Sequence, residues 1–351
     1  MSSEPDSSLG APNSTRPWCV SAWGRAGVYA LFAFVGYFFV RVHLLIPVQY
    51  LKISSYLAGT ERLPFQRRVL PIFLIRLLEH IPIPASIVKG HAGAFANANQ
   101  IWLLLIDLVA FAVFSFFCHR FYRATTKNGM FSLLWYPILI FALVWSYVLH
   151  SEANLYYPYD MLSVAFFTAG LFFVYQRKFL PLLLVMLVGS FNRETTMFLI
   201  PLVALDALAP MTTLNPARLP WKRLPWLKLA LLSAIWIGVK LLLGHFFQLN
   251  DRSQDFLRLG YNRPYLLYPN NWPQLLSGCG FLLPVVFLLR RRIPDTRVAA
   301  YMLIIPIWFI VMCFYGVLTE TRIYGELCTL VAVACTLLLE TYASSPKDAH
   351  A

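Results

Sequence analysis

The stretch FLPLLLVMLVGSFNRETTMFLIPLVALDAL, which runs from Phe179 to Leu208, leaves two folds open and so decides the architecture. It is apolar towards both ends, but the polar residues Asn192–Thr195 interrupt it in the middle. A helix needs about 20 apolar residues to cross about 30 Å of hydrocarbon, so this stretch is too long for one ordinary span. It forms either one tilted helix or two short helices that meet at the polar residues.

The composition excludes a soluble globular protein. The chain has 351 residues, of which 59% are hydrophobic and 13% are charged, whereas soluble domains carry about 25% charged residues. The aromatic and aliphatic content excludes low-complexity disorder, and so apolar a chain is not expected to bind nucleic acid despite its formal net charge of +13. All but one of the six cysteines lie in or at the ends of apolar runs, which argues against a disulfide scaffold.

Apolar runs long enough to span a membrane recur along the rest of the chain. They predict an all-α polytopic integral membrane protein with about 9–10 transmembrane helices. We expect a cytoplasmic tail at 1–25, a single membrane domain at 26–341 and a second cytoplasmic tail at 342–351. The predicted spans are Ala26–Pro47, Ile101–Cys118, Phe131–Leu149, Met161–Tyr175, Leu227–Phe247, Leu275–Leu289, Val298–Leu318 and Leu327–Leu339.

Charge in the short loops assigns each loop to a side of the membrane. Arg120–Lys127 has three basic residues and Arg290–Arg297 has four, whereas Ser151–Asp160 has two acidic residues and no basic one. The positive-inside bias places the first two loops in the cytoplasm and the third outside. Basic residues also flank Phe179–Leu208 on both sides, so the chain must cross an even number of times between them. This favours a helical hairpin with its polar tip at the outer face, and both termini in the cytoplasm.

The first outer segment, Tyr50–Gln100, is too long for a simple connector. Within it, the apolar run Val69–Ile81 carries charges at intervals and is short for a span, which predicts an amphipathic helix at the membrane interface. Glu61, Arg67 and Arg68 precede this helix. The two arginines either anchor the helix at lipid headgroups, or one guanidinium binds a phosphate with the bidentate geometry that suits arginine.

The polar residues Asn192–Thr195 are the most informative cluster. Ionisable residues between apolar runs are costly, and they persist where they pair or line a cavity. Arg193 and Glu194 therefore either form an ion pair with each other that closes the hairpin, or face a cavity that opens to the outer side.

A second cluster, Tyr156–Met161, comes just before a predicted span. Asp160 either caps the following helix, with its carboxylate at the positive end of the helix dipole, or belongs to a site. Tyr157 and Tyr159, with Glu152 nearby, suit a carbohydrate or an isoprenoid headgroup. Such aromatic residues are also ordinary at a membrane interface.

Further charged residues fall on the outer segments or within spans. Arg263 and Arg322 are either solvated loop charges or parts of the same outer site. Asp107 and Asp206 lie inside spans, where each serves either helix packing or a site. The sequence contains no GxGxxG, P-loop, HExxH, CxxC or GxSxG motif.

A long first outer loop with an amphipathic helix, followed by short outer loops that carry acids and arginines, resembles the GT-C superfamily of polytopic membrane glycosyltransferases. The strings Pro64–Pro71, Tyr159–Met161 and Asn192–Thr195 are similar to those of poorly characterised bacterial membrane proteins of that kind. The resemblance covers most of the chain as an architecture and implies the inner (cytoplasmic) membrane of a bacterium. It implies transfer of a sugar, with inversion, from a polyprenyl-phosphate carrier to a glycan or lipid acceptor at the outer face.

The resemblance also implies roles for the candidate residues. The superfamily usually places its catalytic Asp in the first outer loop, but Tyr50–Gln100 contains no Asp, so the base is expected at Glu61, or else at Asp160 or Glu194. No cofactor is expected, and arginine supplies the charge that a metal ion would otherwise provide, although the sequence leaves a divalent ion open. The expected substrate-binding residues are Arg67 and Arg193 at the phosphate, Tyr157 and Tyr159 at the sugar or isoprenoid, and in addition Arg68, Glu152, Arg263 and Arg322.

Two other functions fit the same sequence. A transporter, or a flippase for a lipid-linked substrate, is favoured by the interruption at Asn192–Thr195, because secondary transporters use broken helices. A non-catalytic membrane subunit would instead use the polar loops to bind a partner. A cavity confined to the outer leaflet would favour the transferase, and one that reaches the inner face would favour the transporter.

Overall fold

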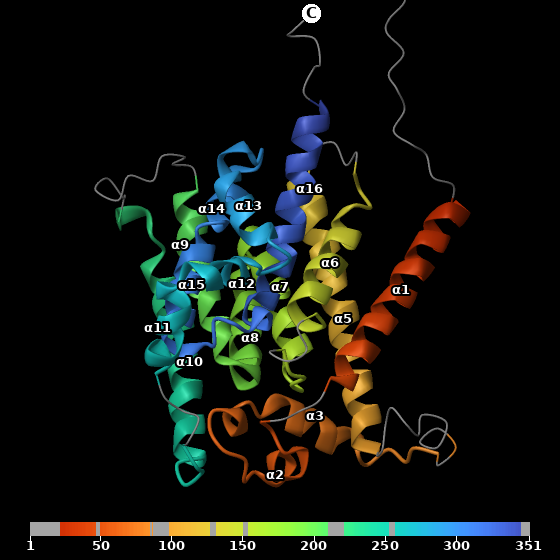
Figure 1. The fold of residues 1–351 in the computed structure, drawn as a ribbon, viewed down its shortest axis with the longest axis vertical. Helices are drawn as coiled ribbons and strands as arrows, with labels where there is room; N and C mark the ends of the chain where they lie inside the picture. The colour runs from red at the N-terminus through yellow and green to blue at the C-terminus, as the bar shows by residue number, and fades with distance from the viewer. Residues whose placement is uncertain are drawn as a thin grey trace, which may run out of the picture.

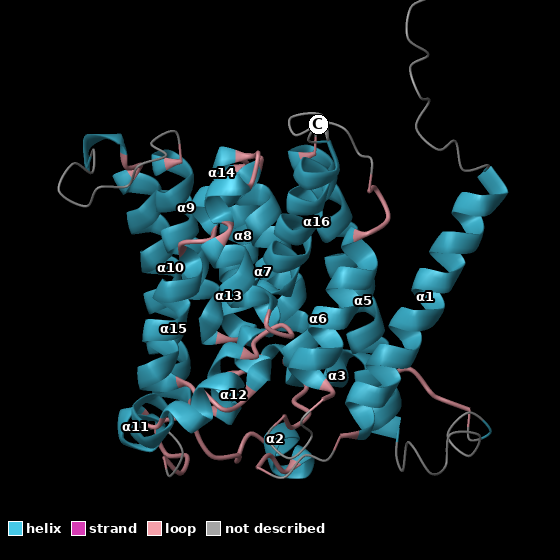
Figure 2. Cartoon of the chain, turned by 45° about the horizontal axis from the view of Figure 1, so that its top comes forward, coloured by secondary structure: helices cyan, strands magenta, loops and turns pink. Residues whose placement is uncertain are grey.

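The computed structural model describes residues 22–46, 50–84, 86, 98–126, 131–149, 154–209, 221–252 and 257–344. Most of the predicted tails, 1–25 and 342–351, lies outside these residues. The described residues form helices joined by loops, and no strand occurs among them (Figures 1 and 2). The all-helical class is therefore confirmed for this part of the chain. In chain order the helices are α1 (Ala22–Leu45), α2 (Ile53–Ala58), η1 (Phe65–Arg67), α3 (Leu70–Leu78), α5 (Ala98–Thr125), α6 (Trp135–Tyr147), α7 (Asp160–Tyr175), α8 (Phe179–Asn192), η2 (Glu194–Phe198), α9 (Leu199–Leu208), η4 (Trp221–Arg223), α10 (Trp226–Phe246), α11 (Leu259–Leu267), η5 (Pro269–Asn271), α12 (Trp272–Leu276), α13 (Leu282–Leu288), η6 (Arg290–Arg292), α14 (Thr296–Tyr301), α15 (Ile304–Tyr315), η7 (Thr321–Leu327) and α16 (Cys328–Ser344).

Several helical segments have the length and composition of membrane spans. Within the described ranges, five segments are long and apolar enough to cross a bilayer, and three shorter apolar helices accompany them. Their outward faces carry large apolar side chains, such as Leu184 on α8 and Leu241 on α10. A water-soluble monomer rarely exposes so much contiguous apolar surface, so these faces fit an α-helical membrane protein. The five segments are Ala26–Leu45, Asn99–Thr125, Trp226–Phe246, Thr296–Tyr315 and Thr321–Ala343.

The stretch Phe179–Leu208 turns back on itself. α8 ends at Asn192, Arg193 adopts an extended backbone with φ −159° and ψ 147°, and η2 and α9 follow. Beyond the two ends of the stretch, Arg177 Nε lies 3.2 Å from Asp206 Oδ2. A continuous helix would separate these two residues by roughly 40 Å, because the rise is about 1.5 Å per residue. The helical hairpin is therefore confirmed, and the single tilted helix is wrong.

Two helices form the centre of the bundle. α16 is buried along most of its length, with Leu330–Ala334 fully enclosed, and it packs against α6, while α7 packs against α5 and α8. Ion pairs join the hairpin tip at Arg193 to Asp160 at the start of α7 and to Glu326 just before α16. These three segments therefore meet at one end of the bundle, opposite the end at which α16 finishes (Figure 1).

The described part of Tyr50–Gln100, which is the predicted first outer segment, lies across the same end. In Figure 1, α2 and α3 lie below the upright helices rather than beside them. α3 buries Ile72 and Ile75 against the bundle and exposes Phe73 and Arg76. The short helix predicted within Val69–Ile81 is thus confirmed, and its exposed face carries both apolar and charged side chains.

One predicted span is wrong as a continuous helix. Leu275–Leu289 contains the end of α12 and the whole of α13, separated by a turn in which Cys279, Gly280 and Phe281 have φ values of 53°, 69° and 64°. A left-handed backbone cannot continue a right-handed helix, and side chains other than glycine adopt it at a cost. Hydropathy does not register this break because Cys and Phe are themselves apolar.

The two carboxylates within predicted spans serve helix packing. Asp107 Oδ2 accepts a hydrogen bond of 3.1 Å from Tyr156 Oη. Asp206 Oδ1 accepts hydrogen bonds of 2.6 Å from both Tyr301 Oη and Arg297 Nε. No disulfide scaffold is present among the described cysteines, since Cys118, Cys279, Cys313, Cys328 and Cys335 are all free.

A glycine positions η7 against α6 and offers a test of this packing. Gly325 lies next to Glu326, and a Cβ at this position would overlap the buried ring of Tyr147. We expect Gly325→Ala to lower the free energy of unfolding by about 1–3 kcal/mol, as overpacked cores do, which unfolding in detergent measures. The control is Gly238→Ala on α10, where nothing lies within 4 Å of the added Cβ and where alanine favours the helix. Equal stabilities of the two variants would contradict the packing.

Candidate functional site

A cavity of about 720 Å³ opens at the end of the bundle that carries the first outer segment. Its walls come from the loop before α3, the hairpin tip, α10 and η7, which are far apart in the sequence. The volume lies within the range of small-molecule sites. The charged residues that line it are the cations Arg68, Arg193, Lys240, Arg258 and Arg322 and the acids Glu194 and Glu320.

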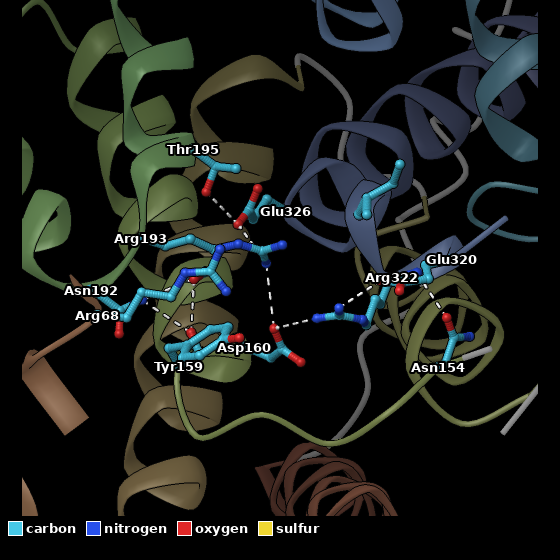
Figure 3. A network of polar contacts seen from close by, with 12 residues as sticks. Arg68, Asn154, Tyr159, Asp160, Asn192, Arg193, Thr195, Glu320, Arg322 and Glu326 are labelled. Atoms are coloured by element: carbon cyan, nitrogen blue, oxygen red, sulfur yellow. Dashed lines mark hydrogen bonds and ion pairs between the residues drawn. The ribbon is translucent and has the colours of Figure 1, made fainter. Parts of the chain in front are cut away.

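Arg193 holds the hairpin tip in place. Its Nη1 lies 3.4 Å from Asp160 Oδ1 and 3.3 Å from Glu326 Oε1 (Figure 3). Thr195 Oγ1 donates a hydrogen bond of 2.7 Å to the same oxygen of Glu326. All three charged side chains are buried, and a buried charge that loses its partner typically costs 3–5 kcal/mol, roughly. Removal of any one of these three charges would therefore leave a buried charge with fewer partners and destabilise the fold.

Asp160 faces a second guanidinium as well. Arg322 Nη1 lies 3.6 Å from Asp160 Oδ1, and Arg322 Nη2 donates a hydrogen bond of 2.6 Å to Glu320 Oε2. The other oxygen, Asp160 Oδ2, has no hydrogen-bond partner among the described residues. The interpretation of Asp160 as a helix cap is wrong, because Tyr159 occupies the cap position and the carboxylate turns to the arginines instead.

Arg68 enters the same network from the first outer segment. Its Nε lies 3.3 Å from Glu194 Oε2, and its guanidinium carbon lies 4.3 Å from the centroid of the Tyr159 ring. Of the two alternatives for Arg193 and Glu194, the mutual ion pair is wrong, since the two side chains pair with different partners and both line the cavity. The Arg68 side chain is only 13% exposed, so it packs inside the protein and does not reach out to headgroups.

Aromatic rings form one wall of this network. Tyr157 and Tyr159 stack with ring centroids 5.3 Å apart, and Phe65 from the first outer segment stacks on Tyr157 at 5.4 Å. The guanidinium carbon of Arg322 lies 4.2 Å from the centroid of the Tyr157 ring. Cation–π contacts of this kind hold an arginine at a fixed place. Asn192 positions the wall by donating a hydrogen bond of 3.0 Å to the carbonyl of Tyr159.

The charge state of Glu194 follows from its neighbours. Burial raises the pKa of Glu194, but the positive charges of Arg68 and Lys240 outweigh it and lower the pKa to about 2. The carboxylate is therefore ionised at any physiological pH and is a weak base. Burial also raises the pKa of Tyr157 above its usual value, with Arg322 acting in the opposite direction, so this tyrosine stays a neutral phenol.

The structure brings most of the residues predicted for the site around one cavity. Five of them line it: Arg68, Tyr157, Arg193, Glu194 and Arg322. Two more lie directly behind the lining: Asp160 contacts Arg193 and Arg322, and Tyr159 contacts Arg68.

The remaining predicted residues do not line the cavity. Glu61 accepts hydrogen bonds from the backbone N–H groups of Lys52 (2.8 Å) and Arg62 (3.0 Å), which occupies both of its carboxylate oxygens within the first outer segment. Arg67 lies beside Glu194 at a separate small gap next to the cavity. Arg263 is exposed on α11. Glu152 lies outside the described residues.

Some residues of the cavity were not predicted. Lys240 on α10 carried a usable signal, because a lysine within an apolar span is rare and commonly functional. Glu320 lines the cavity and pairs with Arg322 of its own loop. Glu326 lies behind the cavity, and its pairing with Arg193 depends on how the hairpin tip meets η7, which the sequence does not show.

No group of three or more His, Cys, Asp or Glu side chains in the described part of the chain is placed to hold a metal ion. The chain matches no protein-family model, no curated protein and no solved structure. Its function must therefore be argued from the cavity itself.

The ion pair between Arg68 and Glu194 predicts a pH dependence of stability. The pKa of Glu194 is about 2 in the folded protein and 4.5 as the ordinary value, so the pair contributes stability above about pH 4.5 and loses it as the pH falls towards 2. We expect the unfolding temperature of the natural protein to exceed that of Glu194→Gln at pH 7, and the difference to shrink by pH 3. A difference that is constant from pH 7 to pH 3 would contradict this charge state.

Proposed function

We propose that the chain is a membrane glycosyltransferase of the GT-C type, which transfers a sugar from a polyprenyl-phosphate donor to a glycan or lipid acceptor. The observation that supports this most directly is the state of Arg322. Arg322 lines the cavity, and its Nη1 lies 3.6 Å from Asp160 Oδ1. Its Nε and Nη1 are enclosed and have no hydrogen-bond partner among the described residues, so a phosphate would bond to them once the side chain turns towards the cavity. Buried donors are nearly always satisfied, and phosphate oxygens are the acceptors that a guanidinium binds most strongly.

The rest of the cavity suits the lipid part of such a donor. Apolar side chains line the cavity together with the cations, so the cavity offers positive charge and apolar surface to one ligand. A soluble anion would contact only the cations, whereas an isoprenoid phosphate would contact the cations and the apolar side chains together. The apolar lining residues are Met197, Phe198, Val311, Met312 and Val317.

We assign the general base to Asp160 among the three predicted acids. Glu194 is too weak a base at a pKa of about 2, and Glu61 lies away from the cavity with both oxygens bonded. Asp160 does not line the cavity either, but it lies directly behind the lining residues Arg193 and Arg322 and retains an oxygen without a hydrogen-bond partner among the described residues. When the donor phosphate takes up Arg322, the carboxylate of Asp160 loses one of its two arginine partners and becomes available to the acceptor hydroxyl.

The proposed transfer requires few protein groups. The acceptor oxygen attacks the anomeric carbon of the sugar, and the bond from that carbon to the phosphate oxygen breaks with its electron pair remaining on the phosphate. Asp160 takes the proton of the acceptor hydroxyl. Arg322 and Arg68 stabilise the negative charge that grows on the departing phosphate.

The proposed topology has about ten crossings and places the cavity at the outer face. The basic loop ends lie at the opposite end of the bundle, where Tyr122 at the end of α5 bonds to Glu340 near the end of α16. A second, smaller groove at that end shares no lining residue with the large cavity. The two cavities are separate, which supports a transferase over an alternating-access transporter.

Labelling of introduced cysteines tests the sidedness, with Cys118, Cys279, Cys313, Cys328 and Cys335 left in place as the unmodified background. Ser54 on α2 and Thr296 on α14 are both exposed, and they lie at opposite ends of the bundle. In intact cells we expect a membrane-impermeant maleimide to react with Ser54→Cys and not with Thr296→Cys, each in a Cys19→Ser background. Reaction of Thr296→Cys alone would reverse the topology, and reaction of both would exclude a sealed orientation.

Binding of polyprenyl phosphate to the full-length protein tests the role of Arg322. We expect Arg322→Gln to weaken binding by about 10- to 100-fold, since charge-assisted hydrogen bonds contribute about 1.5–3 kcal/mol. Arg322→Lys keeps the charge and should lose less. Titration monitored by the fluorescence of a labelled polyprenyl phosphate gives these affinities.

A matched control and a transfer assay complete this test. Arg62→Gln removes a cation from the segment before α3, at the same end of the bundle, but Arg62 bonds to the Tyr50 carbonyl and does not line the cavity, so binding should not change. Asp160→Asn should retain donor binding and lose transfer to an acceptor. Unchanged binding in Arg322→Gln would reject the phosphate site, and undiminished transfer in Asp160→Asn would reject the base.

A further inference from the structure

A groove of about 370 Å³ lies at the end of the bundle opposite the large cavity. It is bounded by the turn between α7 and α8, the last turn of α9 and the start of α10. None of its lining residues takes part in the proposed transfer site. It is therefore a separate feature of the molecule.

The charge of this groove is one-sided. Four cationic side chains line it, namely Arg177, Lys178, Arg223 and Lys228, against the single carboxylate of Asp206. That carboxylate is already occupied, because Arg297, Tyr301 and Arg177 all bond to it. The cations of the groove therefore exceed the negative charge available to them within the described protein.

The backbone presents one of these cations in a costly conformation. Arg177 has a φ of 56°, which side chains other than glycine adopt infrequently. Its Nε is held by Asp206 at 3.2 Å, while its side chain remains 65% exposed. The turn from α7 to α8 is thereby closed tightly, and Arg177 and Lys178 both lie at the mouth of the groove.

The surroundings of the groove are apolar on the side of the spans. α8 and α10 pack against each other, and each presents exposed apolar side chains below the cations. On α8 these are Leu180 and Leu184, and on α10 they are Leu227 and Leu231. An occupant with a negative headgroup and apolar chains would satisfy the cations and cover these faces at the same time.

We propose that this groove binds the phosphate headgroup of an anionic membrane phospholipid, whose acyl chains lie along α8 and α10. Basic pockets between helices near the membrane surface are suited to such headgroups. Lys178 and Arg223 contact the phosphate, and Lys228, whose ammonium lies 5.4 Å from the centroid of the Phe179 ring, closes the site from α10. The occupant is structural lipid and is distinct from the isoprenoid donor of the large cavity.

Titration of the full-length protein in neutral detergent with labelled phosphatidylglycerol tests this site. We expect the triple variant Lys178→Gln/Arg223→Gln/Lys228→Gln to bind at least about tenfold more weakly, because three charges near the headgroup are lost. The charge-conserving variant Lys178→Arg/Arg223→Lys/Lys228→Arg should bind as the natural protein does. It reports on the site even if the neutral triple variant folds poorly.

The matched control removes three exposed cations from the same end of the bundle, as Arg120→Gln/Arg123→Gln/Arg291→Gln. The end of α5 that carries Arg123 lies at this end, because Tyr175 bonds to the Ala124 carbonyl. We expect this variant to bind phosphatidylglycerol normally. Equal weakening in both triple variants would show only general charge attraction and would overturn the site. So would equal affinity for phosphatidylcholine, or equally strong competition by inorganic phosphate.

Discussion

The end of the bundle that carries the cavity is organised by one guanidinium between two carboxylates. Arg193 lies at the tip of the α8–α9 hairpin and reaches Asp160 at the start of α7 and Glu326 at the end of η7. Water is largely excluded from all three side chains, so their electrostatic interaction is strong and any displacement is expensive. The helices can shift relative to one another only if this arrangement moves as a unit. Arg193 also lines the cavity, so this wall of the cavity is held in a fixed position.

Much of the fold could be predicted because it depends on quantities that a sequence carries directly. Run length and hydropathy located most of the helices, and the balance of charge on the flanks of Phe179–Leu208 distinguished a hairpin from a single helix. The failure at Leu275–Leu289 has a local cause, since the left-handed residues Cys279 and Phe281 are apolar. The turn signal lay in Gly278 and Gly280 beside them, which hydropathy does not weigh. Hydropathy reports where a segment prefers to lie, and it does not report the backbone path within the segment.

The sequence identified several residues of the candidate site, but it did not show which of these residues form ion pairs with one another. Charged residues at the ends of apolar runs are few, so Asp160, Arg193 and Arg322 could be selected on cost alone. Their ion-pair partners could not be predicted, because residues that are adjacent in the sequence lie against different parts of the bundle. Arg193 bonds across the bundle and leaves the adjacent Glu194 to Arg68. Glu61 was favoured for its place in the sequence, yet its oxygens are taken up by backbone groups of its own loop.

The central position of α16 has a consequence for how the protein is assembled. α16 follows in the chain all the helices that it packs against, and it is also one of the most enclosed segments of the described chain. The preceding helices are therefore synthesised before the helix that they enclose. Arg193 and Asp160 have no contact with Glu326 until η7 follows them. The large cavity gains Arg322 only at that moment, because η7 directly precedes α16. Until α16 packs into the bundle, the ion pairs of Arg193 and the lining of the cavity are therefore both incomplete.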